Sequence, residues 1–338
     1  MRIGISIDQL SRPTPGGIGT YIRGLLQGLE EVGGGHAVTT FGDTTSRWSE
    51  RVQNVAWVNS DRGVPKGLDV VHATTLAGPY GNRTGVRRSI MLQDLLWRDE
   101  PNSFSARGRK FHELRFLKVV QRDDISVLVS TPELRDRVLG AGIHSERVHV
   151  VTLGLNHGGD MANSEEVKRQ YGITGPFTLV VGTIEPRKNL ERLIEAFAEA
   201  RASAPELGQL VLVGWVGWGE LHIPADVLWL SNLAAPEVRA LQATATVAAY
   251  VPLQEGWGLP PLEALGLGTR VVVSSTVPSC RGRADVIAVD PLDTGAIAEG
   301  LLAALNLSND AAAREARQES VASLTWRRMA EQHLAVWS

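Results

Sequence analysis

The sequence predicts an α/β protein made of two Rossmann-like, doubly wound domains that face each other across a cleft. Three observations support this prediction. Short apolar runs alternate with segments of helical periodicity along the chain. A polar stretch that contains glycine, Asn156 to Asn163, divides these runs into two similar series. The length of 338 residues suits two domains of ordinary size.

The first series predicts a βαβ sheet in an amino-terminal domain of residues 1–157. The apolar runs that we expect to be strands are Ile3–Ile7, Ala37–Phe41, Val70–Val71, Ser89–Leu92, Ser126–Ser130 and Val148–Leu153. Helical patterns lie between some of them, at Tyr21–Leu29 and Glu133–Leu139.

The second series predicts a similar sheet in a domain of residues 158–324. Its expected strands are Thr178–Val181, Gln209–Val213, Val227–Leu230, Val247–Val251 and Arg270–Ser274, and its expected helices are Leu190–Ala200 and Pro236–Ala243. Because open parallel sheets bind ligands where their strands end, we expect a ligand cleft between the two domains.

The last segment, residues 325–338, predicts a helix that packs back toward the first domain. Thr325 is a good helix cap. Trp326, Met329, His333 and Trp337 follow at helical spacing, which indicates one apolar face. We interpret these side chains as packing residues rather than as chemical groups.

Composition excludes several classes of protein. The 34 basic residues are offset by 37 acidic ones, so a formal charge of −3 disfavours a nucleic acid partner. Cys280 is the only cysteine, so no intrachain disulfide or thiolate metal site can form, and we expect a reducing cytoplasm. Neither a signal peptide nor a membrane span is predicted, which leaves a cytoplasmic protein that is soluble or peripheral at the inner face of the membrane.

The segment Glu255 to Leu265 is the strongest candidate for a nucleotide-sugar site. Gly256 and Gly258 allow close approach of the backbone to a ligand, and Pro261 suits a first helical turn. Unpaired amides at a helix start favour a diphosphate. Glu255, and Glu263 in that first turn, can accept hydrogen bonds from sugar or ribose hydroxyls. A capped surface turn is the alternative, but the strand-like runs on both sides favour a ligand loop.

Two further segments contain candidate binding groups. Gly182 to Leu190 opens a helix after a strand, and its Arg187 and Lys188 suit a diphosphate leaving group, although a solvated basic pair is the alternative. Gly16, Gly17 and Gly19 lie between the first strand and the first helix, where glycine permits close approach to a phosphate or sugar. They do not form a dinucleotide fingerprint, and a tight turn is the alternative.

Together these residues resemble the retaining glycosyltransferases of family 4, also called glycosyl transferases group 1, which have the GT-B fold. The resemblance extends over nearly the whole chain. Its marks are Gly16–Gly19 with Tyr21, Asp69–Ala73, Gly182–Asn189 and Glu255–Glu263, of which the last two are the most specific. The resemblance implies an acceptor domain at the amino terminus and a donor domain after it.

The resemblance also implies residue roles. Arg187 and Lys188 would bind the donor diphosphate, Glu255 the sugar hydroxyls and Glu263 the ribose, while Asp94 would orient the acceptor. The donor-binding residues that it implies are Gly16, Gly17, Gln93, Gly182, Thr183, Gly214, Gly256, Trp257, Gly258, Leu259 and Glu263.

Three positions depart from the family pattern. Gln93 stands where family members commonly have a histidine, Thr183 where some have a phosphate-binding arginine, and Pro252 where serine is frequent. An amide can bond a hydroxyl but cannot titrate near neutral pH, so Gln93 excludes a proton role there. One hypothesis for glutamine in place of histidine is that the donor carries a 6-deoxy sugar such as rhamnose.

The implied reaction is transfer with retention at the anomeric carbon, by front-face attack of an acceptor hydroxyl as the diphosphate leaves. No Asp-x-Asp metal motif ends a strand, and Arg187 with Lys188 can supply the charge of a divalent ion. We therefore expect a metal-independent hexosyltransferase with no cofactor, whose nucleoside diphosphate sugar is a substrate.

The segment Ser105 to Arg122 mixes basic and apolar residues at roughly helical spacing. A membrane-facing or lipid-acceptor surface is one interpretation. An ordinary solvated helix whose apolar face packs on the first sheet is the alternative that we favour.

Three functions fit these features. The first is transfer of a hexose, such as mannose or rhamnose, to a hydroxyl of a glycan, a lipid-linked saccharide or a small molecule. The second is a catalytically weak accessory subunit that binds nucleotide sugars. Gln93 in place of the family histidine is the observation in favour of this alternative. The third is a nucleotide-sugar epimerase of the same fold, which would form product from the donor alone.

Overall fold

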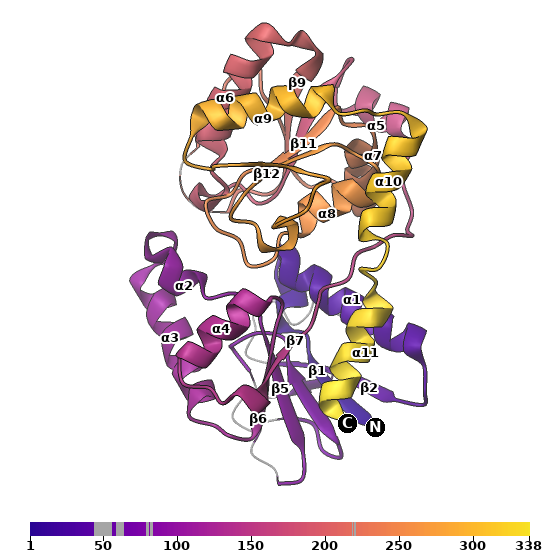
Figure 1. Ribbon diagram of the computed structural model, residues 1–338. Coiled ribbons are helices and arrows are strands. Elements are labelled where there is room, and N and C mark those ends of the chain that lie inside the picture. Colours follow the sequence, from indigo (N-terminus) through magenta and orange to yellow (C-terminus); the bar gives the residue numbers. More distant parts are fainter. Residues whose placement is uncertain (44–55, 59–63, 79–80, 82–83, 218, 220) are drawn as a thin grey trace. The chain divides into compact units, whose positions relative to one another are not determined.

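The computed structural model describes residues 1–43, 56–58, 64–78, 81, 84–217, 219 and 221–338 (Figure 1). The chain divides into two compact units. Unit 1 contains Met1–Gly154 together with Leu324–Ser338, and unit 2 contains Leu155–Ser323. The sequence suggests a boundary after residue 157, whereas the units meet in the chain after Gly154.

Unit 1 is built on a parallel sheet with the strand order β3-β2-β1-β4-β5-β6-β7. Its strands are β1 (Arg2–Ser6), β2 (Ala37–Asp43), β3 (Ala56–Val58), β4 (Val70–Ala73), β5 (Arg87–Leu92), β6 (Ile125–Val129) and β7 (Val148–Val150). Because neighbouring strands pair in parallel, their carboxyl ends meet at one edge of the sheet.

Helices cover both faces of this sheet. They are α1 (Gly16–Val32), α2 (Leu96–Asp99), α3 (Ala106–Val120), α4 (Pro132–Gly140) and α11 (Trp326–Trp337). Ile90 of β5 packs with Phe116 of α3 and Val138 of α4 in one buried cluster. Successive strand residues point to opposite faces, so the preceding Ser89 points to the other face, where it meets α11.

Glycine allows α1 and α11 to pack closely. A Cβ atom at Gly24 would lie 2.3 Å from the ring of Trp326, and one at Gly28 would lie 2.1 Å from the Trp326 carbonyl oxygen. The Thr325 hydroxyl accepts a hydrogen bond of 3.1 Å from the Arg328 amide and so caps α11. The yellow helix of Figure 1 thus lies against α1 although the two are far apart in sequence.

A buried hydrogen-bond chain joins α11 to the sheet. Trp337 Nε1 donates to Ser89 Oγ at 2.7 Å, and Ser89 Oγ lies 2.8 Å from His72 Nδ1. The Tyr21 hydroxyl then bridges His72 Nε2 at 2.7 Å and His333 Nε2 at 2.8 Å. All five side chains are at least 98% buried, so water does not compete for these bonds.

Unit 2 is built on a second parallel sheet, with the strand order β10-β9-β8-β11-β12-β13. Its strands are β8 (Phe177–Val181), β9 (Gln209–Val213), β10 (Leu228–Leu230), β11 (Val247–Tyr250), β12 (Val271–Ser274) and β13 (Ile287–Val289). Its helices are α5 (Ser164–Gln170), α6 (Leu190–Ser203), α7 (Ala235–Thr244), α8 (Leu259–Gly266), α9 (Thr294–Asn306) and α10 (Ala311–Val321).

The second sheet is also covered on both faces. Leu212 of β9 packs in one buried cluster with α6 and α9. The preceding residue, Val211, packs in another cluster with α5 and α7. This alternation is the pattern of a doubly wound sheet.

The structure changes some element boundaries. Helix α1 begins at Gly16 rather than at Tyr21, because Pro15 precedes the first turn and its carbonyl accepts a 3.2 Å bond from the Gly19 amide. The glycines expected in a loop therefore form the first turn of α1. The sequence patterns also did not indicate β3, β13, α5, α9 and α10, which are short, polar or rich in alanine.

Cys280, the only cysteine of the sequence, is a buried free thiol, and burial raises its pKa to about 11.

Among the described helices, none combines the length and the apolar character that crossing a bilayer requires.

Candidate active site

Four side chains of unit 2 form a compact charged cluster around Glu255. Lys188 Nζ lies 2.6 Å from Glu255 Oε2, and Arg187 NH1 lies 3.1 Å from the same oxygen. The Tyr250 hydroxyl donates to this oxygen and accepts a 2.6 Å hydrogen bond from Lys188. Arg187 also pairs with Glu185 at 2.5 Å. The structure thus brings together three predicted site residues, Arg187, Lys188 and Glu255.

The end of β8 and the start of α6 fix the two cations. Residues Pro186–Lys188 form a 3-10 turn, and Asn189 follows in the left-handed conformation with φ of 58°. The Asn189 side chain donates to the carbonyl oxygens of Val251 at 3.1 Å and Pro291 at 2.7 Å. Asparagine tolerates this backbone conformation, and its two bonds anchor the turn that presents Lys188.

Charges within the cluster stabilise one another. Burial alone would raise the pKa of the Glu255 carboxyl, but Lys188 and Arg187 outweigh burial and hold that pKa well below its usual range. Burial and the charge of Glu255 raise the pKa of Tyr250 well above its usual value. At neutral pH Glu255 is therefore a carboxylate and Tyr250 a neutral phenol, and Glu185 is the second acid that pairs with Arg187.

The loop after Glu255 is held by its neighbours. Glu255 Oε1 accepts a 3.1 Å bond from the Gly256 amide, and Ser279 bonds the carbonyl oxygens of Trp257 and Gly258 at 3.1 and 2.9 Å. Gly258 has φ of 97°, and a Cβ atom there would lie 2.4 Å from Val277 Cγ1, so only glycine fits. The buried Trp257 Nε1 has no hydrogen-bond partner among the residues that the structure describes.

Glu263 lies in the second turn of α8 and not in its first turn. The helix begins at Leu259, with proline in its first turn, rather than at Pro261. The amides that the sequence assigned to the helix start therefore belong to Leu259 and its neighbours. Burial raises the pKa of Glu263, although Gln242 and Arg239 act in the opposite direction.

Gly182, Thr183 and Gly214 lie together where β8 and β9 end. The Gly182 amide bonds the Val213 carbonyl oxygen at 2.9 Å. A Cβ atom at Gly214 would lie 1.8 Å from the Gly182 carbonyl oxygen, so close backbone contact requires glycine there. The need for glycine at position 214 is thus explained by packing.

The remaining predicted residues belong to unit 1. Gly16 and Gly17 are exposed in the first turn of α1, and no atom lies within 4 Å of where their Cβ atoms would be. Gln93 and Asp94 follow β5, and Asp94 Oδ1 accepts a 3.0 Å bond from the Leu96 amide. The Gln93 Nε2 atom is buried and has no partner within the described part of the chain.

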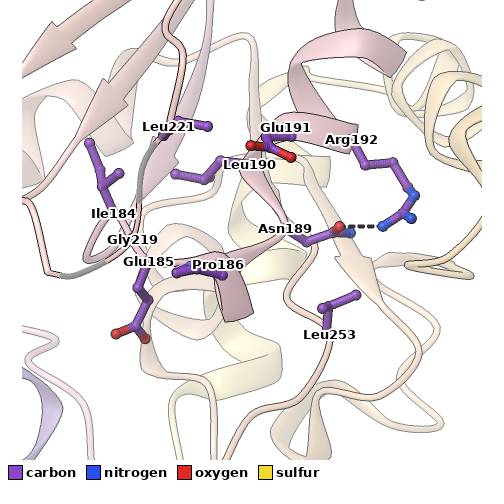
Figure 2. A pocket seen from close by; sticks show the side chains of 10 residues that line it. All are labelled: Ile184, Glu185, Pro186, Asn189, Leu190, Glu191, Arg192, Gly219, Leu221 and Leu253. Carbon is purple, nitrogen blue, oxygen red and sulfur yellow. Dashed lines mark hydrogen bonds between the residues drawn. The ribbon is translucent and has the colours of Figure 1, made fainter. Parts of the chain in front are cut away.

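A cavity of about 240 Å³ lies beside the cluster, at the start of α6 (Figure 2). It is lined by Ile184, Glu185, Pro186, Asn189, Leu190, Glu191, Arg192, Gly219, Leu221 and Leu253. Arg192 bends back to Asn189 in this view. Glu185 links the cavity to the cluster because it also pairs with Arg187.

Over the described residues, no cluster of three or more histidine, cysteine, aspartate or glutamate side chains has an arrangement that could hold a metal ion. The charged groups of the cluster instead come from Arg187, Lys188, Glu185 and Glu255.

The part of the chain that contains the charged cluster matches a known protein family. Residues 163–319 match the family of glycosyl transferases group 1. The match includes Lys188 and Glu255 of the cluster and also Glu263.

Curated relatives are similar over parts of the chain. The O-antigen chain mannosyltransferase B of Escherichia coli is 34% identical over 149 residues, which cover 38% of this chain and 36% of the relative. The serotype-specific mannosyltransferase WbdA of Escherichia coli is 26% identical over 251 residues, which cover 68% of this chain and 30% of the relative. The aligned part is thus about a third of the length of either relative.

Solved structures resemble the chain over nearly its whole length. Anabaena HepE in complex with UDP and glucose has a TM-score of 0.75 at 15% identity, covering 99% of this chain and 98% of that one. WaaG, a glycosyltransferase involved in lipopolysaccharide biosynthesis, has a TM-score of 0.67 at 16% identity with the same coverage. The chain therefore has the GT-B fold, with two parallel-sheet Rossmann-like domains, and the predicted fold class is confirmed.

Sequence reasoning did not single out Tyr250 or the pairing of Glu185. Tyr250 lies in an apolar run and ends β11, five residues before Glu255 in the chain. A hydroxyl at the carboxyl end of a buried strand was the available signal.

Proposed function

We propose that this chain is a glycosyltransferase of family 4 that moves a hexose from a nucleoside diphosphate donor to a hydroxyl of a saccharide. The observation that supports this proposal is the cluster of Lys188, Arg187 and Glu255 inside the family-matched residues. Its cations are preorganised by the Asn189 turn, as stabilisation of a charged leaving group requires.

The cluster still has hydrogen-bonding groups that a nucleotide sugar could use. An ammonium group has three N–H donors. Among the described residues Lys188 uses one toward Tyr250 and one toward Glu255, so one N–H remains for a phosphate oxygen. Glu255 Oε2 is crowded, but Oε1 accepts only from the Gly256 amide among the described residues. Oε1 can therefore accept a hydroxyl of the transferred sugar.

The reaction that we propose retains the anomeric configuration and needs no metal ion or cofactor. As the bond from the anomeric carbon to the diphosphate oxygen breaks, Lys188 and Arg187 stabilise the charge on the leaving diphosphate. The acceptor hydroxyl attacks from the same face and gives its proton to the departing phosphate oxygen. Glu263 would bind the ribose, the amides of residues 257–259 the phosphates, and Asp94 would orient the acceptor.

We propose mannose or rhamnose as the transferred sugar. Two relatives are named mannosyltransferases of O-antigen or serotype-specific synthesis, which supports mannose and a glycan or lipid-linked acceptor. Gln93 in place of the family histidine supports a 6-deoxy sugar instead. Equal binding of mannose and rhamnose donors would contradict the rhamnose hypothesis.

The test uses the purified full chain with GDP-mannose, UDP-glucose and dTDP-rhamnose. We expect slow hydrolysis of one donor, lost in Lys188→Ala and Glu255→Ala and kept in Arg201→Ala, which removes an exposed cation of the same domain. Proton NMR of the first sugar released or transferred gives the anomeric configuration. Inversion would contradict retention, and loss of activity with EDTA that magnesium restores would contradict metal independence.

Two other outcomes separate the alternatives. Donor binding that depends on Lys188 and Glu255 without turnover would indicate an accessory subunit, for which Gln93 is the supporting observation. An altered sugar formed from the donor alone would indicate an epimerase.

We also propose contact of α3 with an anionic membrane surface. As the interpretation favoured from the sequence expects, α3 packs on the first sheet through Phe116 and Val119. However, Phe111, Leu114 and Leu117 of the same helix are 44%, 50% and 40% exposed. The only acid within this helix is Glu113, which pairs with Arg98, and the cations Arg107, Arg109, Lys110 and Lys118 of the same helix are exposed.

A further inference from the structure

Three arginines of unit 2 lie together at the amino ends of its strands, away from the charged cluster around Glu255. Arg270 directly precedes β12, whereas Arg314 and Arg317 belong to α10, which packs beside α8 (Figure 1). Arg317 is 7% exposed, and the other two arginines are half-buried. Tyr250 of the charged cluster ends β11, which pairs with β12, so the two groups of charges lie at opposite edges of one sheet.

The side chain of Arg317 is adjacent to both other arginines. Its Nε atom donates to the Gly268 carbonyl oxygen at 2.8 Å, while Arg314 Nη2 donates to the oxygen of the preceding residue at 2.9 Å. Its Nη1 atom donates to the Ser308 carbonyl oxygen at 3.0 Å, while Arg270 Nη1 donates to the oxygen of the residue before Ser308 at 3.3 Å. The three guanidinium groups therefore form one group, which we call the arginine cluster.

Part of this arrangement is structural, because the arginines satisfy the ends of three helices. The last carbonyl oxygens of a helix have no partner within it. Those that the arginine cluster binds lie in or just after the last turns of α7, α8 and α9, and they belong to Ala243, Thr246, Leu267, Gly268, Leu305, Leu307 and Ser308. Each helix end carries only about half a negative charge, so three ends offset roughly half of the three positive charges.

No acidic side chain pairs with the arginine cluster within the described part of the chain. The two acids whose charge acts on Arg317 are engaged elsewhere. Asp285 pairs with Arg283 at 2.6 Å, and Asp310 caps α10 by accepting a 2.8 Å bond from the Ala313 amide. Burial and the charges of the other two arginines outweigh these acids and lower the pKa of Arg317. The cluster thus retains uncompensated positive charge.

The arginine cluster also keeps N–H groups that reach the surface. A guanidinium group has five N–H donors in a planar fork. Arg270 Nη2 and Arg314 Nη1 make no hydrogen bond to any residue that the structure describes, and neither is a buried atom. Paired donors of this kind match the oxygens of a phosphate group.

We propose that the arginine cluster is an anion site of unit 2 that binds a phosphate group. The free N–H groups of Arg270 and Arg314 donate to phosphate oxygens, and Arg317 adds its charge from a buried position. The phosphate belongs either to a soluble ester or to a lipid headgroup. The site lies within unit 2 and uses none of the residues around Glu255, so it is independent of the proposed function.

Calorimetry of the full chain with inorganic phosphate tests the site. All proteins carry Lys188→Ala, so that phosphate bound by the charged cluster around Glu255 does not obscure the measurement. We expect Arg314→Gln to weaken phosphate binding about tenfold, because it removes charge-assisted hydrogen bonds. Arg314→Lys keeps the charge and should bind phosphate more tightly than Arg314→Gln.

Two comparisons separate binding from folding. Both Arg314 variants lose bonds to the ends of α7 and α8, so both should melt at a similar temperature without phosphate. Phosphate should then raise the melting temperature of the lysine variant more than that of the glutamine variant. Arg201→Gln is the matched control, because it removes the same charge from an exposed ion pair of unit 2 and should leave phosphate binding unchanged.

Sedimentation with vesicles of phosphatidylcholine and phosphatidic acid distinguishes the two sources, because phosphatidic acid carries a phosphate monoester. The protein for this assay carries Phe111→Ser, Leu114→Ser and Leu117→Ser, so that α3 does not contribute. Sedimentation that Arg314→Gln abolishes would identify a lipid headgroup. Phosphate binding that depends on Arg314, without sedimentation, would identify a soluble phosphate.

Binding in neither assay, or binding that Arg314→Gln leaves unchanged in both, would overturn the proposal. The arginines would then serve only the helix ends. Such a result would not affect the proposed function, which depends on loss of donor hydrolysis in Lys188→Ala and Glu255→Ala.

Discussion

Tyr21 and His333 are 312 positions apart in the sequence and share a buried hydrogen bond of 2.8 Å between the Tyr21 hydroxyl and His333 Nε2. The direction of this bond follows from the other ring nitrogen. His333 Nδ1 lies 2.8 Å from the Met329 carbonyl oxygen, which can only accept, so we assign the proton to Nδ1. Nε2 therefore accepts, and the tyrosine donates.

The same reasoning fixes the direction of the other hydrogen bonds in this buried network. The Tyr21 oxygen is free to accept from His72 Nε2, which leaves His72 Nδ1 to accept from Ser89. Ser89 in turn accepts from the indole N–H of Trp337. Ser89, His72, Tyr21 and His333 each donate once and accept once, so an added proton on either histidine would face another donor.

The first prediction is that acid weakens the attachment of α11. Burial lowers the pKa of His333 to about 4, below its usual 6.5, and burial lowers that of His72 as well. The unfolded chain then binds more protons than the folded one between these pH values, so stability is lost as the pH falls from about 6.5 toward 4. We expect His333 to contribute a loss of about 2 kcal/mol at pH 5.

Hydrogen exchange of the α11 amides, corrected for the intrinsic effect of pH, measures this loss. His333→Gln keeps a donor and an acceptor but cannot titrate, and it should flatten the pH dependence. An equally steep dependence in this variant would contradict the assignment to His333.

The second prediction concerns the buried cations of unit 2. The side chains of Lys188 and Glu255 are 11% and 14% exposed, so Lys188→Met leaves the carboxylate with one buried cation fewer. We expect unit 2 to lose about 2 kcal/mol of stability, and Glu255→Gln in the same protein to restore part of it. Urea unfolding followed by hydrogen exchange in β8 and β11 measures both changes.

Arg201→Met is the control for this change. Arg201 pairs with Asp226 in the same unit, but their side chains are 36% and 62% exposed. We expect this variant to lose less than about 0.5 kcal/mol. Equal losses at positions 188 and 201 would show that burial of the pair has no role.

The third prediction is that Gly28→Ala disrupts the packing of α11 on α1. The new methyl group would lie 2.1 Å from the Trp326 carbonyl oxygen, and backbone cannot move aside as a side chain can. We expect a loss of about 2–3 kcal/mol in the opening free energy of α11, from hydrogen exchange.

Gly140→Ala provides the comparison in another helix of the same unit. No atom lies within 4 Å of the new methyl position, and alanine favours helix over glycine. This variant should be neutral or more stable by up to about 1 kcal/mol. A harmless Gly28→Ala would be inconsistent with the contact between α1 and α11.

The fourth prediction concerns α3. We expect the chain to sediment with vesicles that contain phosphatidylglycerol at low salt, and less so at high salt, because screening weakens the attraction of its cations. Replacing Phe111, Leu114 and Leu117 by serine should weaken binding at least tenfold, on the order of 1 kcal/mol for each half-exposed side chain. These side chains are exposed, so the variant should keep its fold. Failure of the parent protein to sediment at low salt would remove the membrane proposal.

The sequence predicted the central strands well because both faces of these sheets are buried. Continuous apolar runs such as Val271–Ser274 have no competing explanation once helices alternate with them. It did not indicate α5, whose Ser164–Gln170 segment is polar, because contact with α7 stabilises that helix rather than its own periodicity. The start of α1 was wrong because glycine is a poor helix former, and a proline cap with tertiary packing overrides that preference.

The candidate site could be predicted only in part. Lys188 and Glu255 stand in motifs whose spacing points to phosphate and sugar, and the structure places them in contact. Tyr250 was not found, because its role depends on where its hydroxyl points within an apolar strand.

The composition of unit 1 has a consequence for synthesis on the ribosome. Unit 2 is continuous from Leu155 to Ser323, whereas unit 1 needs Leu324–Ser338 to cover Tyr21 and His72. The first 154 residues therefore emerge from the ribosome before the helix that covers their sheet has been made. Until the whole of the second unit has been translated, the buried hydrogen-bonding groups and the apolar face under that helix are exposed to water. The later unit has all its residues before the earlier one does, and a nascent chain stalled between them is the state most exposed to aggregation and to chaperones.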